Sequence, residues 1–439
     1  MMARTALNST SALLLLTMFS GPGCGDDSHA DETMGEGGTE VGSTGTPATT
    51  GPVASTGALE TDGGSGDESS TGSDSEDGPQ PSGPDHAIDP AVPGPYPVGV
   101  MTVEFVDPTR EGGRPLITEI WYPATDDAIG MDTVTYTPED IFRPDAIEVL
   151  GNDLSSEIAT SAVRDAPMRG DDGPYPVVFF SHGSGGIRMQ STYYTVDMAS
   201  HGYVVISPDH IGNTLSDIIV TGDLTTADLA ESLGNRPLDL SFVREELELL
   251  EADDPLSALM DFEHVGVTGH SFGALTSLRW MGQGADVDAV VAQTPPSMEL
   301  NWLAISTPLS DFTTPIQLQV GGVDLTLPAE TNADTVWEAA SEPRSRMTLS
   351  NAGHFTFSDM CGLNIADIEA VAKLGVSSAL EDGCTKENTD PEIAAAAIRH
   401  YGIGFFNVYL RESTPTLDLL TQEAGEAIAG DLLTWEAEL

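Results

Sequence analysis

The chain has 439 residues and a formal net charge of −54, because 70 acidic side chains are balanced by only 16 lysines and arginines. So acidic a surface repels phosphate backbones and anionic lipid headgroups, which argues against nucleic acids and anionic membrane surfaces as partners. The length exceeds that of one average domain but does not require two large ones.

Residues 1–24 have the three parts of an export signal. Arg4 precedes an apolar run from Ala12 to Phe19, and small residues lead from there to Cys24. The apolar run is too short to remain in a bilayer as a spanning helix. The arrangement resembles a bacterial lipoprotein signal, so Cys24 is the predicted lipidation site. The alternative is an ordinary secreted protein in which Cys24 is incidental.

Residues 25–88 consist mainly of Gly, Ser, Thr, Pro, Asp and Glu, with almost no large apolar side chain. Such a segment cannot bury enough apolar surface to offset the entropy lost on ordering. We therefore predict a disordered acidic linker over 25–88 and a catalytic domain over 89–439.

Three cysteines are present. With Cys24 lipidated, Cys361 and Cys384 remain as a pair in an exported protein, and a disulfide between them is expected. The alternatives are two free buried cysteines or a metal site. No histidine lies near the pair at ligand spacing, so we predict no metal, and no organic cofactor is implied.

The domain begins with two predicted strands, Val98–Pro108 and Pro115–Pro123, joined by a glycine-rich turn into a hairpin. Residues 124–172 are irregular and polar, with one short helix predicted over 144–150. A connection of this length is a candidate cover for a site.

Strands and helices then alternate along the chain. Strands are predicted over Tyr175–Phe180, Tyr203–Pro208, Val265–Thr268, Val287–Pro295, Pro315–Gly322 and Ser345–Gly353. Helices are predicted over Met189–Gly202, Arg236–Asp253, Phe272–Met281 and Glu392–Glu412. This order predicts an α/β fold with a mostly parallel sheet, covered by helices on both faces and carrying an antiparallel hairpin at its start.

Ser271 lies in "GHSFG", between a predicted strand and a predicted helix. The pattern alone is weak, since chance produces it often in a glycine-rich chain. At a strand–helix junction, flanking glycines allow the sharp turn that exposes a nucleophilic hydroxyl at the carboxyl edge of the sheet. Ser271 is therefore the candidate nucleophile, and a structural serine in a tight turn is the alternative.

A serine nucleophile needs a base, and in this architecture the chain order is serine, acid, histidine. Only His354 and His400 follow Ser271. His354 comes directly after the last predicted strand, on a loop free to reach the serine, whereas His400 lies within the last predicted helix. We predict His354 as the base and a surface or packing role for His400.

Asp324 follows the strand Pro315–Gly322 and is the predicted acid, which would hold the imidazole tautomer and stabilise the imidazolium. Three other aspartates after Ser271 come too early, before a strand or at its start, and are set aside: Asp286, Asp288 and Asp311. A solvated loop aspartate is the alternative interpretation of Asp324.

The oxyanion of an acyl-transfer intermediate needs two backbone N–H donors. We assign them to Phe272, directly after the nucleophile, and to Ser184 in the loop "SHGSGG". His182 in that loop is predicted to brace it. His210, in the loop "PDHIGNT", is predicted to anchor its own loop, and substrate contact is the alternative.

Four motifs together, "FFSHGSGG", "ASHGYVVISPDHIGNT", "GHSFGA" and "AGHFTF", resemble the α/β-hydrolases related to platelet-activating-factor acetylhydrolase and predicted dienelactone hydrolases. Bacterial cutinase-like polyesterases are a more distant likeness. The resemblance covers roughly residues 97–412 and implies a serine carboxylesterase with Ser271, Asp324 and His354 as its triad.

Two departures limit the resemblance. In the acetylhydrolase the acid follows an earlier strand, near Gln293 and Thr294 here, where no carboxylate is found. The chain instead has the cutinase spacing, with Asp324 four residues before Pro328. Dienelactone hydrolases use a cysteine nucleophile, which Ser271 replaces.

The function we expect is an exported hydrolase, membrane-anchored by lipid in the bacterial cell envelope or secreted. It would cleave short-acyl, lipid or polyester-like carboxylic esters through an acyl-serine intermediate. Two alternatives stay open: a catalytically inactive hydrolase-fold binding protein on the cell surface, and a peptidase or amidase.

Overall fold

The structure is a computed structural model that describes residues 89–110, 112–151, 154–222, 224–297, 308–362 and 381–439. The predicted export signal, Cys24 and the linker over 25–88 lie outside these residues, and they stay predictions. The predicted domain over 89–439 falls within the described part apart from its gaps.

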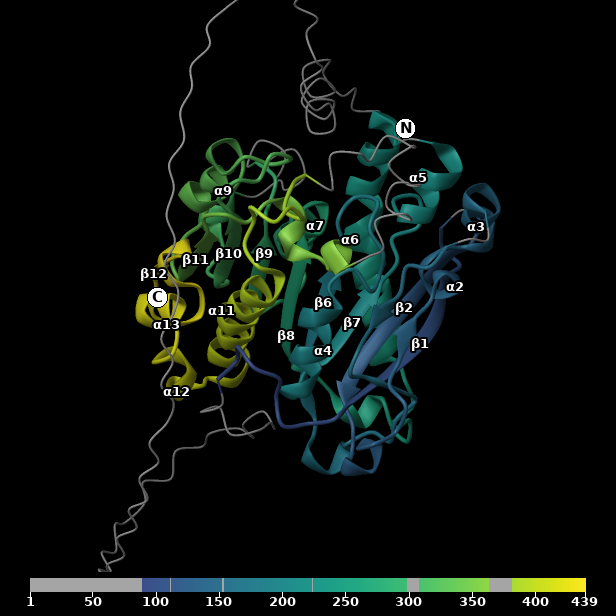
Figure 1. Cartoon of the computed structure of the whole chain (residues 1–439). Helices are drawn as coiled ribbons and strands as arrows, with labels where there is room; N and C mark the ends of the chain where they lie inside the picture. Colours follow the sequence, from purple (N-terminus) through teal and green to yellow (C-terminus); the bar gives the residue numbers. More distant parts are fainter. Residues whose placement is uncertain (1–88, 111, 152–153, 223, 298–307, 363–380) are drawn as a thin grey trace, which may run out of the picture. The chain divides into compact units, whose positions relative to one another are not determined.

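A ten-stranded sheet forms the centre of the fold (Figure 1), in the order β12-β11-β10-β9-β8-β6-β7-β2-β1-β5. In chain order its strands are β1 (Val98–Asp107), β2 (Arg114–Pro123), β5 (Val163–Arg164), β6 (Tyr175–Ser181), β7 (Val204–Pro208), β8 (Met260–His270), β9 (Ala289–Gln293), β10 (Ile316–Gly321), β11 (Arg344–Leu349) and β12 (Leu433–Glu438). The strands from β7 to β11 are parallel, whereas β1 pairs antiparallel with β2, β2 with β7 and β12 with β11. The predicted parallel sheet and antiparallel hairpin are confirmed.

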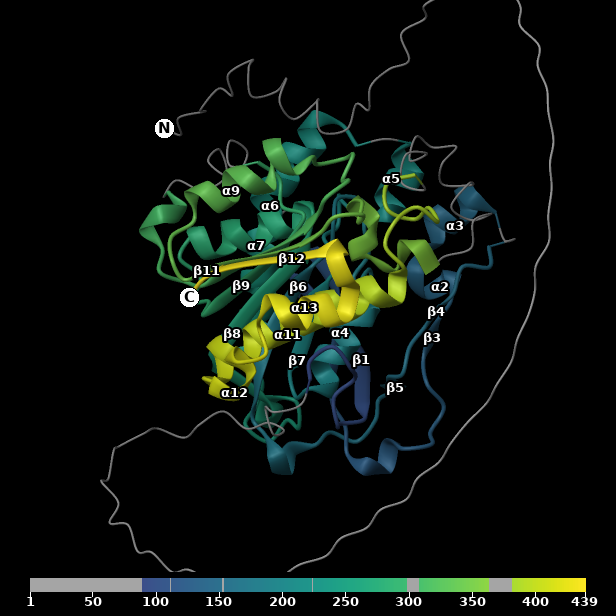
Figure 2. The ribbon, with the colours of Figure 1, turned by 60° about the vertical axis from the view of Figure 1, so that its left-hand side comes forward.

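Helices cover this sheet on both faces. They are α2 (Pro138–Ile141), α3 (Pro144–Leu150), α4 (Thr192–Ser200), α5 (Leu215–Thr221), α6 (Thr226–Glu248), α7 (Phe272–Gly282), α9 (Ala333–Ala339), α11 (Pro391–Arg411), α12 (Thr414–Leu417) and α13 (Gln422–Ala429). Apolar residues of α4, α11 and α13 pack on one face and those of α6, α7 and α9 on the other (Figure 2).

The sequence of β6 explains why it lies at the centre. Its side chains alternate between the two faces, so that Val178 and Phe180 join the α4 and α11 side while Val177 and Phe179 join the α6 and α7 side. A strand buried on both faces is apolar at every position, which is why "YPVVFF" shows no alternation.

Two glutamines of β10 face α11 within the core. Gln317 and Gln319 donate side-chain hydrogen bonds of 3.0 Å to the carbonyl oxygens of Tyr401 and Ile398. Gly402 allows this approach, since a Cβ there would lie 3.0 Å from Gln319 Nε2 of β10 and 2.3 Å from the Tyr194 hydroxyl of α4. These polar side chains are therefore satisfied within the core.

The structure extends the predicted elements in three places. Helix α6 begins at Thr226, ten residues before the predicted Arg236, with a capping box from Thr225 and Asp228, and it contains Pro237. The predicted start was wrong because proline is most readily placed in a first turn. Strand β12 was not predicted, and residues 124–172 contain β3 (Thr135–Tyr136), β4 (Ile158–Ala159) and β5 besides the predicted helix α3.

The direction in which the chain moves along the sheet reverses at β6. The chain passes from β6 to β7 on one side and then returns across β6 to β8 on the other. Ligands bind in open α/β sheets at such reversals. The loops that follow β6 and β8 meet there, because Ser181 and Gly269 are register partners.

Candidate active site

Ser271 occupies a strained turn between β8 and α7. Its φ of 55° and ψ of −117° are uncommon for a residue with a side chain, and its N–H donates to Gln293 O at 2.9 Å. Strain of this kind persists only where the surroundings enforce it, and it is frequent at functional sites.

The two glycines of "GHSFG" allow the end of β6 to approach this turn. A Cβ on Gly269 would lie 2.5 Å from the carbonyl oxygen of Ser181, and a Cβ on Gly273 would lie 1.8 Å from the same atom. Neither glycine has a positive φ. Close packing against β6 therefore explains both glycines better than conformational freedom does.

His354 and Asp324 form a hydrogen-bonded pair beside the same edge. His354 begins the 3-10 turn η6 (His354–Phe357) after β11, and Asp324 lies in the loop after β10. The His354 Nδ1 to Asp324 Oδ2 distance is 2.8 Å, and both side chains are almost fully buried. With Nδ1–H donating to the carboxylate, Nε2 is the nitrogen able to accept a proton.

The pKa of His354 reflects two opposing effects. Burial lowers it, but the charge of Asp324, its hydrogen bond and then the charge of Asp382 outweigh burial, so the pKa of His354 rises above its usual 6.5. The protonated imidazole is therefore stabilised by this environment.

Asp382, which sequence reasoning missed, joins the loops of the pair. Its Oδ1 accepts the N–H groups of His354 and Leu325, each at 3.0 Å, and its Oδ2 accepts the N–H of Thr326 at 2.8 Å. The side chain is buried. Its position two residues before Cys384 in the sequence gives no hint of this role.

The structure contains the predicted disulfide between Cys361 and Cys384. Cys361 belongs to η7 (Asp359–Gly362), which follows the turn of His354, and Cys384 lies two residues after Asp382. The disulfide therefore joins the two segments that Asp382 also joins through its hydrogen bond to His354.

The residue that precedes Ser271, His270, contacts His354 of this pair. The Nε2 of His270 is 2.9 Å from His354 O, and the two rings are 4.6 Å apart. Burial and then the charge of His354 lower the pKa of His270 to about 3, so its ring is neutral and donates here. Among the described residues the Ser271 hydroxyl has no hydrogen-bond partner, so no Ser271–His354 bond is formed.

The loop after β6 leaves the N–H group of Ser184 without a hydrogen-bond acceptor in the described chain. The N–H groups of Gly183, Gly185 and Gly186 each donate to a protein oxygen, at distances from 2.8 to 3.1 Å. The N–H of Ser184 has no such acceptor. Nor has the N–H of Phe272, which is the first residue of α7 and so lacks an intrahelical acceptor.

Gln190, which no sequence pattern singled out, bridges the two loops. Its Oε1 accepts the N–H of Gly183 at 2.8 Å, and its Nε2 lies 2.9 Å from His270 Nδ1. The residue before Ser271 and the loop of Ser184 are therefore held by one side chain.

The other histidines near the site are structural. His182 lies within the loop after β6, with Nδ1 2.7 Å from Gly183 O. His210 contacts Ser181 Oγ and Asp239 Oδ2, each at 2.9 Å. Both are fully buried, and burial followed by the charge of Arg236 lowers the pKa of His210 to about 4. This agrees with the bracing and anchoring predicted from sequence.

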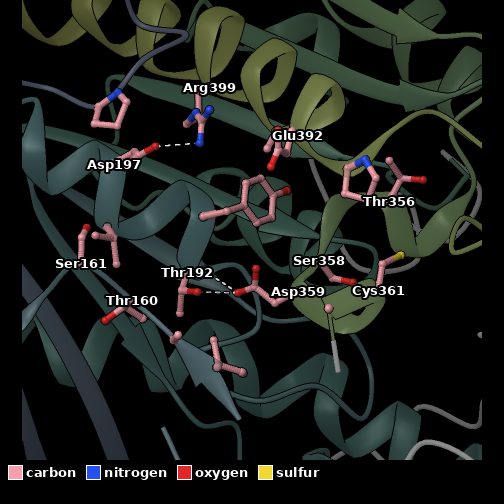
Figure 3. Close-up of a pocket in the computed structure, with 18 of the residues that line it drawn as sticks. Thr160, Ser161, Thr192, Asp197, Thr356, Ser358, Asp359, Cys361, Glu392 and Arg399 are labelled. Atoms are coloured by element: carbon pink, nitrogen blue, oxygen red, sulfur yellow. Dashed lines mark hydrogen bonds and ion pairs between the residues drawn. The ribbon is translucent and has the colours of Figure 1, made fainter. Parts of the chain in front are cut away.

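A cavity of about 760 Å³ lies beside α4, η7 and the start of α11 (Figure 3). Its walls include Thr192, whose N–H and hydroxyl donate to Asp359, and the ion pair of Asp197 with Arg399. Ser271, Asp324 and His354 do not line it. The cavity is thus separate from the catalytic candidates, and we assign it no part in their chemistry.

The described residues hold no cluster of three or more His, Cys, Asp or Glu side chains arranged for a metal ion. Within the same part of the chain, no helix combines the length and apolar character that crossing a membrane requires.

Comparisons with known proteins show what the chain is similar to in sequence and in fold. Residues 85–249 match the family model described as platelet-activating factor acetylhydrolase, isoform II. The solved structure of a ferulic acid esterase from Streptomyces cinnamoneus superposes with a TM-score of 0.57 and 24% identity, over 77% of this chain and 96% of that one. The chain has the α/β-hydrolase fold of that structure and is similar in sequence to acetylhydrolases and cutinases.

Curated relatives of this α/β-hydrolase match at low identity. The platelet-activating factor acetylhydrolase of Canis lupus familiaris is 22% identical over 201 residues, which is 37% of this chain and 43% of that protein. Cutinase 1 of Thermobifida cellulosilytica is 26% identical over 188 residues, which is 42% of this chain and 62% of that protein. The chain thus spans about half the length of the curated relatives it matches. The family-model match includes Ser184 but ends before Ser271.

Proposed function

We propose that the protein is an exported serine esterase in which Ser271 is the nucleophile, His354 the general base and Asp324 the acid. The observation that carries the proposal is the 2.8 Å bond between buried His354 and Asp324, on loops beside a serine held in a strained strand–helix turn. These are the parts of a Ser-His-Asp triad in the chain order of the α/β-hydrolases.

In the first step the Ser271 hydroxyl attacks the ester carbonyl while His354 Nε2 accepts its proton. The tetrahedral oxyanion binds the N–H groups of Ser184 and Phe272, which have no acceptor in the described chain. His354 then returns the proton to the alcohol that leaves. A water molecule, activated by His354, hydrolyses the acyl-serine and regenerates Ser271.

Asp324 acts by orienting the imidazole and stabilising its charged form. The raised pKa of His354, to which Asp324 contributes the largest opposing effect against burial, supports this role. The full bond between Ser271 and His354 would form on substrate binding, since catalytic hydrogen bonds are often long in the free enzyme.

Esters are favoured as substrates over amides because the matched proteins carry the names acetylhydrolase, cutinase and ferulic acid esterase. An inactive binding protein is less favoured, since all three triad positions are filled and the strained serine turn is kept. We propose short-acyl, lipid or polyester-like esters as the substrate class.

Export and anchoring through Cys24 form a separate part of the proposal. A Cys24→Ser variant is expected to leave the membrane fraction without losing specific activity. Retention of the variant in membranes would contradict lipid attachment at this cysteine.

The test is turnover of a short-chain p-nitrophenyl ester combined with labelling by a fluorophosphonate. We expect turnover and a labelled Ser271 peptide, and both lost in Ser271→Ala. Ser277→Ala is the matched control, because Ser277 lies six residues further on in α7 with its hydroxyl donating to Gly273 O at 2.9 Å. Absence of turnover and of label in the unmodified protein would favour the binding-protein alternative. Faster hydrolysis of a matched amide would favour a peptidase or amidase.

A further inference from the structure

We propose that Arg236 of α6 is a positioning residue that holds both halves of the oxyanion hole. The inference rests on the proposed esterase function and adds to it a residue outside the triad. Arg236 is 0% exposed and lies behind the loop that carries Ser184. It contacts the ring of Phe272 and the carbonyl oxygen of Gly183, which belongs to the same peptide group as the Ser184 N–H.

The guanidinium holds the loop through two successive carbonyl groups. Nη1 donates to His182 O at 2.6 Å, and Nη2 donates to Gly183 O at 3.0 Å. The carbonyl of Gly183 and the N–H of Ser184 belong to the same planar peptide group and point in opposite directions. Fixing the oxygen therefore fixes the direction in which the Ser184 N–H points.

The hydrogen bond from Arg236 to Gly183 O also makes the Ser184 N–H a stronger donor. A cation on a carbonyl oxygen polarises the peptide group, and hydrogen bonds in a buried chain reinforce one another. Gly183 O also receives the N–H of Gly186, at 3.1 Å, and lies 2.7 Å from His182 Nδ1. In the peptide group that joins Gly183 to Ser184, several donors therefore hold the carbonyl oxygen. The N–H of the same group has no acceptor in the described chain.

The second donor residue packs on the same cation. The guanidinium carbon of Arg236 lies 4.8 Å from the centroid of the Phe272 ring, and Phe272 supplies the other predicted N–H. Arg236 also donates to Asn213, whose Nδ2 donates to Ser184 Oγ at 3.1 Å. One side chain therefore joins the loop after β6, the loop after β7 and the beginning of α7.

The charge of Arg236 is not neutralised by a partner. No described carboxylate lies within ion-pair distance, and Asp239, one turn further along α6, bonds to Arg114 and His210 instead. Burial lowers the pKa of Arg236 to about 9, and the charge of Asp239 only partly opposes it. A buried unpaired cation is costly, and it leaves positive potential beside the place where the oxyanion forms.

Arg411 provides a matched control on the same chain. It too is buried, it donates to the successive carbonyl oxygens of His201 and Gly202, and it lies 4.0 Å from the ring of Tyr203. These contacts are at the end of α4 that precedes β7, away from the carboxyl edge. Arg411 therefore has the same structural contacts without a place beside the site.

The experiment compares Arg236→Met, Arg236→Lys and Arg411→Met with the unmodified chain. Melting temperature, kcat and KM on a p-nitrophenyl ester, and the affinity of a trifluoromethyl ketone are measured. We expect Arg236→Met to lower kcat by about 10- to 100-fold with little change in KM, since loss of a whole donor costs about 100- to 1,000-fold. Affinity for the ketone should fall by the same factor, and Arg236→Lys should restore part of both.

Arg411→Met should lower the melting temperature and leave kcat unchanged. If Arg236→Met does not fold, Arg236→Lys tests the inference instead. Lysine keeps the positive charge but loses the paired hydrogen bonds to His182 O and Gly183 O. Wild-type kcat and ketone affinity in a folded Arg236 variant, or an equal loss of kcat in Arg411→Met, would overturn the inference. Absence of ester turnover in the unmodified chain would instead overturn the proposed function.

Discussion

Replacing Asp382 with asparagine removes the carboxylate that joins the loops of His354 and Asp324. One Asp382 oxygen accepts N–H groups from His354 and Leu325, and the other accepts the N–H of Thr326 at 2.8 Å and its hydroxyl at 2.6 Å. Asparagine keeps one acceptor oxygen. If that oxygen still accepts the N–H groups of His354 and Leu325, the amide NH₂ faces the N–H and the hydroxyl of Thr326, which are donors themselves.

The expected loss of stability follows from these bonds. A buried donor left unpaired costs about 1–3 kcal/mol, and the hydroxyl of Thr326 can rotate away from the amide. We therefore expect Asp382→Asn to lower the free energy of unfolding by ~1–3 kcal/mol. A domain of ordinary stability, about 5–15 kcal/mol, remains folded after such a loss.

The same substitution changes the pH dependence of activity. The charge of Asp382 contributes to raising the pKa of His354, and the base works only in its neutral form. Without that charge the pKa of His354 falls, so the acid limb of the kcat/KM profile shifts to lower pH. We also expect kcat to fall about 10-fold or more, because small displacements of catalytic groups are costly.

Urea denaturation and a pH profile of kcat/KM measure both effects. Asp254→Asn is the control, because Asp254 accepts the N–H of Leu256 at 2.9 Å near the start of β8, away from the carboxyl edge. Unchanged stability together with an unchanged acid limb in Asp382→Asn would refute this account of how His354 is held.

Further predictions concern the serine turn, the triad and the disulfide. Gly273→Ala should abolish activity and reduce soluble yield, because its Cβ would lie 1.8 Å from a carbonyl oxygen of β6; a soluble, active variant would contradict the packing argument. Ser271→Ala and His354→Ala should each lower kcat by orders of magnitude, and the double variant should be scarcely worse, since the residues act as a unit; additive losses would argue for separate roles. Replacing Cys361 and Cys384 with serine should destabilise the fold by ~3 kcal/mol and lower kcat more than it changes KM; thermal unfolding with kinetics checks this, and unchanged kcat would show that the bridge does not hold the base.

The parts of the site that follow from local sequence were predictable. Ser271 is marked by glycines that the turn against β6 requires, and His354 by its place in the loop that follows β11. Asp324 required one further step, because each aspartate after Ser271 had to be placed before or after a predicted strand. Only an aspartate that follows a parallel strand lies at the same carboxyl edge of the sheet as Ser271. The structure brings Asp324 and His354 into contact, whereas their catalytic roles stay a proposal.

The residues that hold the site were not predictable in this way. Asp382, Gln190 and Arg236 each bond across loops that are distant in sequence. A buried arginine beside a proline in a helical pattern has no local signature of what it contacts. Likewise β12 lies at the edge only because it pairs with β11, a contact that its own sequence does not specify.

The most direct measurement is the mass of the enzyme after rapid acid quenching during turnover of a p-nitrophenyl ester. The proposed mechanism predicts that a fraction of the chain gains the mass of the acyl group, and that peptide mapping locates it on Ser271. The adduct should be absent from Ser271→Ala and should accumulate if His354→Ala slows its hydrolysis more than its formation. Turnover without acylation of Ser271, or an acyl group on another residue, would contradict the central claim.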